Sequence, residues 1–254
     1  MTRSPTRTLF HSSKLIRILS DLAILDAAEP GAAFAEKLGL WVDYSDAIAL
    51  SAALNASTAS PAGARPVAPS AAGVAVSDEL ARLRAGLVNS ITQSDSTKAS
   101  RSLVEWPSPD FELPVKVATA FEPYRRYYAA CQREMDSDIR PLRVSAREAL
   151  ARTSPALRQL AALDAALDKV LCERESKLLS TVPLLLKKRF EHLFKAHQQT
   201  LLDTQQADNP DTWMKQGAWL ARFCHELQTV LLAELDVRLQ PTVGLIEALH
   251  NEKK

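Results

Sequence analysis

Apolar residues recur every three or four positions through most of the second half of the chain. The pattern runs through residues 121–150, 157–201 and 213–249. This spacing is typical of amphipathic α-helices. Because the connections between the three runs are short, we expect three long helices that fold back on one another as an antiparallel bundle with coiled-coil-like packing.

Local signals mark where these helices begin and where they bend. Ser154 followed by Pro155 predicts a capped start for the second helix, and Asn209 or Asp208 is expected to cap the third. A proline inside a helix removes a backbone donor and crowds the preceding turn, so each one is expected to kink its helix or split it in two. Four prolines lie inside the apolar patterns: Pro123, Pro141, Pro183 and Pro241.

The N-terminal part of the chain predicts a separate, smaller unit. Residues 1–11 are expected to form a disordered tail, and residues 12–56 a small helical unit of three short helices. A unit of this size is marginal by itself. Its helices are expected to begin at Ser12 or Ser13, at Pro30, and at Asp43 or Ser45.

A segment of low complexity follows this unit. Residues 57–76 are dominated by Ala, Pro, Ser and Gly, and Arg65 is their only charge. Such a composition has too little to bury to hold one conformation, so it predicts a flexible linker. The bundle is then expected to occupy residues 77–250, with Ser77 capping its first helix.

Composition supports an all-α fold. The chain has seven glycines, and none lies between Val88 and Gln216. Hairpins and tight turns depend on glycine for positive φ, so this gap argues against a sheet-rich domain.

Charge and cysteine content narrow the setting. The 31 Lys and Arg residues nearly balance the 30 Asp and Glu residues, so no global field attracts nucleic acid or an anionic membrane. Three widely separated cysteines, Cys131, Cys172 and Cys224, do not form a disulfide framework and suit a reducing compartment. No signal sequence or membrane span is visible, so we expect a soluble, cytoplasmic bacterial protein.

The segment "LLSTVPLLLKKRFEHLFKAH" combines an apolar face with a basic cluster, Lys187, Lys188 and Arg189. On a helix the cations lie opposite the apolar face, with Glu191 nearby, so a solvated surface is the preferred interpretation. His197 lies on the apolar side. We expect it to be a core or interface histidine with a hydrogen-bond partner, and a ligand role is the less favoured alternative.

Two further groups of charged residues are candidates for interaction. Within "CERES", Arg174 and Glu175 lie near the seam of the helix, where a polar layer between helices is favoured over a catalytic carboxylate. A set of arginines together with the Lys187–Arg189 cluster offers a cationic face on a bent dimer. These arginines are Arg140, Arg143, Arg147, Arg152 and Arg158.

Motifs for catalysis are lacking in the sequence. It contains no G-x-S-x-G elbow, no Walker loop and no G-x-G-x-x-G. Glu247 and His250 have the spacing used in di-iron bundles, but no second copy of that motif exists. We therefore expect no enzyme activity, no catalytic residue, no cofactor and no metal.

The segments "SSKLIRILSDLAILD" and "WVDYSDAIALSAALNA", the Ala/Pro linker and "FEPYRRYYAACQREMD" together resemble an uncharacterised proteobacterial family of unknown function. The resemblance spans most of the chain and rests on packing patterns rather than on chemistry. Genes of that family often neighbour genes of membrane proteins. The resemblance therefore implies membership in a multi-component, envelope-linked assembly.

These observations predict a non-enzymatic helical scaffold or adaptor that binds protein partners. Long helices with excess apolar surface often complete their burial by self-association, so a homodimer is expected. The first alternative is a membrane-surface protein that uses the cationic face, and the second is a nucleic-acid-binding protein. The sequence does not identify the partner.

Overall fold

A computed structural model describes residues 13–22, 42–55, 69–92, 106–107 and 117–251 of the chain. Every regular element in these ranges is helical, which confirms the all-α prediction. The elements are α1 (Lys14–Asp21), α3 (Tyr44–Asn55), α4 (Pro69–Thr92), α5 (Val117–Ala151), α6 (Pro155–Leu179), α7 (Val182–Thr204), a 3₁₀ turn η2 (Pro210–Thr212) and α8 (Trp219–Asn251).

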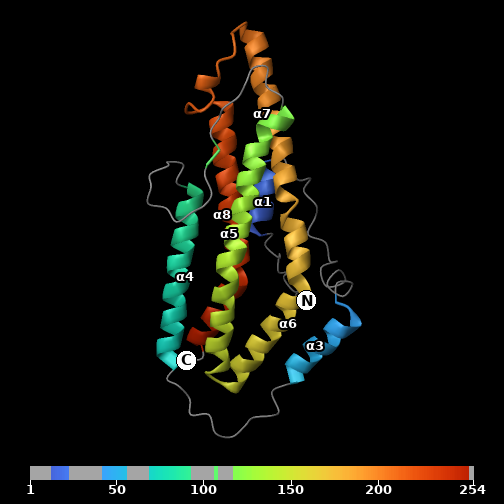
Figure 1. Cartoon of the computed structure of the whole chain (residues 1–254), viewed down its shortest axis with the longest axis vertical. Coiled ribbons are helices and arrows are strands. Elements are labelled where there is room, and N and C mark those ends of the chain that lie inside the picture. Colours follow the sequence, from blue (N-terminus) through green and yellow to red (C-terminus); the bar gives the residue numbers. More distant parts are fainter. Residues whose placement is uncertain (1–12, 23–41, 56–68, 93–105, 108–116, 252–254) are drawn as a thin grey trace, which may run out of the picture.

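Two helices, α5 and α8, form the centre of an elongated bundle (Figure 1). Helix α5 packs against α4, α6, α7 and α8, and α8 also packs against α1, α4 and α7. Helices α6 and α7 follow one another along the side of the bundle and return the chain to the end where α8 begins (Figure 1). Helix α5, the successive helices α6 and α7 taken together, and helix α8 therefore run in alternating directions, as predicted.

Several predicted helix caps are confirmed. The Ser13 hydroxyl accepts a hydrogen bond from the Ile16 N–H at 3.3 Å, and the Ser154 hydroxyl accepts one from the Leu157 N–H at 3.2 Å. The Asp43 carboxylate accepts one from the Asp46 N–H at 2.7 Å. Each cap satisfies one of the backbone donors that a helix leaves free in its first turn.

The prolines act differently according to their position. Pro183 is the second residue of α7. Helix α6 ends at Leu179 and α7 begins at Val182, so the expected split occurs just before this proline. Pro123 and Pro141 remain inside the continuous helix α5, and Pro241 inside α8. A proline is tolerated in a first turn because the donor it lacks has no partner there in any case.

The predicted cap of the last helix is displaced. Asn209 does cap a helical turn, because its side chain accepts a hydrogen bond from the Asp211 N–H at 3.0 Å, but that turn is the short η2. Helix α8 begins only at Trp219, after Gly217 adopts a φ of +85°. The connection is held down by Trp213, which is 1% exposed.

The structure also corrects the boundary of the predicted linker. Helix α4 begins at Pro69, so residues 69–76 are its first turns and Ser77 lies inside the helix instead of capping it. Val76 is buried in a core cluster with Leu249 of α8. Burial of this face, together with the high helix propensity of alanine, outweighs the low complexity of the segment. Residues 57–68 lie outside the described residues.

The described helices of the predicted N-terminal unit pack on the bundle. Helix α1 contacts α8, and α3 contacts α6. Leu15 and Leu19 of α1 are buried in the main core. A short helix with two leucines on one face gains most of its stability from such packing. The predicted tail at residues 1–11 and the helix expected at Pro30 lie outside the described residues.

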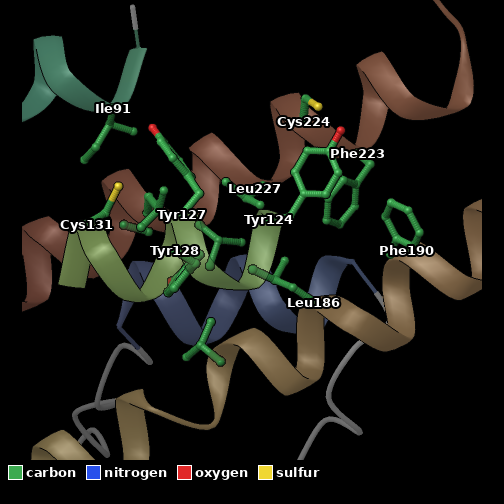
Figure 2. Packing of buried hydrophobic residues seen from close by; sticks show 14 of the residues in the cluster. Ile91, Tyr124, Tyr127, Tyr128, Cys131, Leu186, Phe190, Phe223, Cys224 and Leu227 are labelled. Carbon is green, nitrogen blue, oxygen red and sulfur yellow. The ribbon is translucent and has the colours of Figure 1, made fainter. Parts of the chain in front are cut away.

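Aromatic side chains dominate the core where α5, α7 and α8 meet. Tyr124, Phe190 and Phe223 converge there (Figure 2). The ring centroids of Phe190 and Phe223 are 5.0 Å apart, and those of Tyr124 and Phe223 are 5.4 Å apart, both edge to face. A second, smaller cluster of Leu, Ile, Val and Ala lies where α5 ends and α6 begins.

Candidate functional site

A buried carboxylate lies at the centre of the bundle. Glu234 of α8 is fully buried and accepts hydrogen bonds from the Tyr128 hydroxyl at 2.6 Å and from the Gln132 amide at 2.9 Å. The Arg238 Nε donates to the same carboxylate at 2.9 Å. Burial, followed by the neighbouring Glu234 charge, raises the pKa of Tyr128 well above its usual value. The hydroxyl is therefore a permanent donor to Glu234.

Arg238 connects this buried layer to the surface. Its side chain is only 8% exposed, and it pairs with Glu234 on one side and with Asp136 of α5 on the other. Gln132 also donates to the Leu179 carbonyl at the end of α6, at 3.0 Å. The layer thus joins α5, α6 and α8 through hydrogen bonds and ion pairs. Such a fully paired layer specifies how the helices align.

Two adjoining hollows lie over this layer, between α5 and α6. The wider one has a volume of about 500 Å³, and the narrower one has a volume of about 210 Å³. The two hollows share three lining residues, Asp136, Ser176 and Arg238, so they adjoin one another. We call these the wide groove and the narrow groove. They are the candidate site.

The narrow groove contains part of the predicted cationic face, but its charges are paired. Arg143 and Arg147 of α5 face Asp164 and Asp168 of α6, with four N–O distances between 2.6 and 2.8 Å. Burial opposes ionisation of Asp164, but hydrogen bonds from both arginines outweigh it and hold its pKa below the ordinary value of 3.8. These arginines tie α5 to α6 and do not offer free positive charge. Arg140 is exposed and lines the narrow groove.

The remaining cations of the predicted face are also dispersed. Arg189 forms a nearly buried, two-pronged pair with Glu226 of α8, at 2.7 and 2.8 Å. Arg152 pairs with Glu148, and the Arg158 Nε donates to the Ala151 carbonyl.

The two lysines of the basic cluster also differ in their surroundings. Lys187 lies 4.0 Å from Glu191, and Lys188 is exposed. Most of these cations are thus paired in the described part of the chain, and the sequence does not show which carboxylates a neighbouring helix supplies.

The predicted polar layer at Arg174 and Glu175 lies at the edge of the observed one. Both residues are half-buried, and Glu175 lines the narrow groove. Burial raises the pKa of Glu175 above its ordinary value, and the nearby Arg238 charge opposes this shift. The centre of the layer is Glu234, which the sequence interpretation missed. The signal was present, because Glu234 follows Leu227, Val230 and Leu231 at the spacing of a buried helix face.

His197 has the partner expected of a histidine on an apolar face. Its Nε2 lies 2.9 Å from the Asp208 Oδ1, which also accepts a hydrogen bond from the Trp213 indole at 2.7 Å. The imidazole stacks on Trp219 with a centroid distance of 5.9 Å. These contacts stabilise the connection between α7 and α8. His197 therefore has a structural role, and it lies away from the groove.

The three cysteines differ in exposure. Burial raises the pKa of the Cys131 and Cys224 thiols to about 12, so both are poor nucleophiles. Cys172 is exposed and lines the narrow groove. Within the described ranges no group of three or more His, Cys, Asp or Glu residues is arranged to hold a metal ion.

Among the helices that the structure describes, none combines the length and the apolar character needed to cross a membrane.

A family model described as "Protein of unknown function (DUF3348)" matches residues 1–251. Comparison with curated proteins finds no match, and comparison with solved structures finds none either.

Proposed function

Since this chain belongs to the DUF3348 family, whose function is unknown, we propose a function from its surface: a non-enzymatic helical adaptor that binds a protein partner through α3. The proposal rests on one observation, the outer face of that helix. The bundle interior is filled by apolar side chains and paired charges. In an adaptor such an interior serves as a rigid support for the binding surface.

The outer face of α3 lacks charge. At about 100° per residue, the exposed positions of this helix form one continuous arc. The arc consists of Tyr44, Ser45, Ala47, Ile48, Ala49, Ser51, Ala52, Leu54 and Asn55, all of them exposed. The opposite side, with Leu50 and Ala53, faces α6. A solvent-exposed helix face normally carries charged residues, so an uncharged arc of this width favours contact with another protein.

The chemistry of the arc indicates what binds there. Tyr44 is 84% exposed and Ile48 is 53% exposed, one turn apart, and they offer apolar anchors. Ala47, Ser51 and Ala52 are small, which lets a second backbone approach closely. We therefore expect the partner to contribute an α-helix whose uncharged, apolar stripe packs against α3.

The test places a charge in this face and measures binding to the partner. A tagged full-length chain is used to isolate interacting proteins from its own host, and each candidate is then purified and titrated against the chain. We expect a purified partner to bind wild type, and Ile48→Glu to weaken that binding by about tenfold or more because a charge would be buried at the interface.

A matched control distinguishes this from a general surface effect. Val144 of α5 is 43% exposed and apolar, so Val144→Glu adds the same charge elsewhere and should leave binding unchanged. Equal binding by both variants would contradict the α3 proposal. If light scattering instead shows a wild-type dimer that Ile48→Glu makes monomeric, the face binds a second copy and the adaptor proposal fails.

The two alternatives receive less support. The cationic face predicted for a membrane-surface or nucleic-acid role needs unpaired cations, whereas three of its members, Arg143, Arg147 and Arg189, are paired with carboxylates. Membership of the partner in an envelope-linked assembly remains a proposal that comes from the family resemblance alone.

A further inference from the structure

The wide groove contains a concentration of arginines. Arg125, Arg126 and Arg133 of α5 line it, together with Arg238 of α8. Not all of them are free to bind a ligand. Arg238 is held by Glu234 and Asp136, and Arg125 makes two hydrogen bonds to Glu122, at 2.6 and 2.8 Å.

Two of these arginines keep open hydrogen-bond donors. The Arg126 side chain is 71% exposed, and its Nε is 4.0 Å from Glu122, which is beyond hydrogen-bond distance. Arg133 is exposed, and no carboxylate in the described part of the chain lies within 4.0 Å of its guanidinium. The residues four positions before and after it, Ala129 and Ser137, carry no charge, and Asp136, three positions after it, is paired with Arg238. The fold therefore leaves these two guanidinium groups without a strong partner.

The position of the two arginines suits one ligand. They are seven residues apart on α5, which is two helical turns or about 10 Å along the axis. Long side chains at that spacing can converge on a ligand with two neighbouring anionic groups. A guanidinium presents a planar fork of donors that matches phosphate oxygens.

The surroundings agree with a small ligand in this half of the groove. A volume of about 500 Å³ is within the range of small-molecule sites. Two further polar residues, Ser176 and Ser180, also line it, and the Ser180 hydroxyl donates to the Lys177 carbonyl. Asp136 lines both grooves and is paired with Arg238, but the narrow groove is lined by Asp168 and Glu175 in addition, so it is less suitable for an anion.

We propose that the wide groove is a binding site for a ligand that carries phosphate groups, with Arg126 and Arg133 as the residues that hold them. This site is separate from the outer face of α3, so it does not depend on the proposed adaptor function. The same phosphate chemistry is offered by a soluble ligand, such as a diphosphate, and by the headgroup of an anionic phospholipid.

The experiment uses the full-length chain and two probes. Sodium pyrophosphate is titrated calorimetrically at low ionic strength, and flotation is measured with vesicles of phosphatidylcholine mixed with phosphatidic acid. We expect saturable 1:1 binding of pyrophosphate that is weakened about tenfold or more in the double variant Arg126→Gln/Arg133→Gln, because two charge-assisted contacts are lost. Both positions are exposed, so the variant should fold, and circular dichroism checks this.

Arg82→Gln is the matched control, because Arg82 is an exposed arginine on α4. It should bind as wild type does. Flotation that depends on Arg126 and Arg133, without pyrophosphate binding, would support the phosphate site and assign it to a lipid headgroup. The proposal is overturned if neither probe binds, or if the double variant binds as tightly as the control.

Discussion

At the scale of single residues, the most informative side chain is Glu234. It is fully buried, yet it accepts hydrogen bonds from Tyr128, Gln132 and Arg238. An ionised group in a protein interior is tolerated only when its hydrogen-bonding capacity is filled. The stability of the bundle should therefore depend on each donor around this carboxylate.

The Tyr128→Phe variant tests that dependence. Removal of the hydroxyl leaves Glu234 short of one donor, and we expect the free energy of unfolding to fall by about 1–3 kcal/mol. Urea denaturation followed by circular dichroism measures it. Tyr124→Phe is the control, because the Tyr124 hydroxyl is equally buried but lies beside the Cys224 thiol, a weak hydrogen-bonding group (Figure 2). A loss in Tyr124→Phe as large as that in Tyr128→Phe would contradict the special role of Glu234.

The second prediction at this scale concerns acid stability. Hydrogen bonds from Arg143 and Arg147 outweigh the burial of Asp164 and hold its pKa below 3.8. The folded chain therefore binds fewer protons here than the unfolded chain, and stability rises with pH in that range. The contribution of Asp164 is fully present above its ordinary pKa and is lost as the pH falls through the lowered folded value.

Asp164→Asn should reveal this contribution. We expect a loss of about 1–3 kcal/mol at about pH 6, because two arginines lose a charged acceptor, and a much smaller loss at about pH 3. Urea denaturation of both proteins at the two pH values is the measurement. A difference between variant and wild type that stays constant with pH would show that the ionisation of Asp164 does not stabilise the fold.

At the scale of elements, the prolines show that the same residue has opposite effects in different positions. Pro183 is buried in the first turn of α7, whereas Pro141 is exposed inside α5. In a first turn the fixed φ of proline suits the helix, and in the interior proline removes a backbone hydrogen bond.

Substitution by alanine should therefore give results of opposite sign. We expect Pro141→Ala to stabilise the protein by about 1–3 kcal/mol, because a helix-interior proline is replaced at a position that loses little packing. Pro183→Ala should destabilise it by about 1–2 kcal/mol, because chain stiffness and buried contacts are lost. Thermal and urea denaturation of the two variants measure this. Effects of the same sign would contradict the view that proline is favourable in the first turn of α7 and unfavourable in the interior of α5.

The elements also show how far the sequence pattern reaches. The caps at Ser13, Asp43 and Ser154 and the break near Pro183 follow from local chemistry, so they were predictable. The start of α4 at Pro69 was not predictable, because it depends on burial of Val76 against helices far away in the chain. A local pattern contains no record of such contacts.

At the scale of the whole molecule, the core has two unequal parts. The large cluster contains the aromatic residues of α5, α7 and α8, including Phe190 and Phe223. The smaller cluster, at the junction of α5 and α6, contains only Val, Leu, Ile and Ala, with Leu157 and Ala161 among its members. Aromatic side chains bury more area and contribute more to stability than alanines do. We infer that the two ends of the bundle differ in local stability.

Hydrogen exchange measured by mass spectrometry tests this inference. We expect the amides of residues 155–165 to exchange about tenfold or more faster than those of residues 220–235, because the former open locally and the latter exchange only with global unfolding. Exchange of both segments at one common rate would show that the bundle unfolds as a single unit and would contradict the inference.

The sequence by itself determined the all-α class, the approximate extent of the long helices and the caps at Ser13, Asp43 and Ser154. These features depend on apolar spacing and on contacts between residues a few positions apart, which a single chain displays directly. Only the tertiary structure decided which charges are paired. Arg143 and Arg189 are indistinguishable from free surface cations in the sequence, but each meets a carboxylate from another helix. Arg126 and Arg133 became candidates for ligand binding for the opposite reason, because no carboxylate in the described ranges lies closer than 4.0 Å to either guanidinium. The physical cause is that electrostatic pairing depends on distance in space, and distance in space between helices is set by packing rather than by position along the chain.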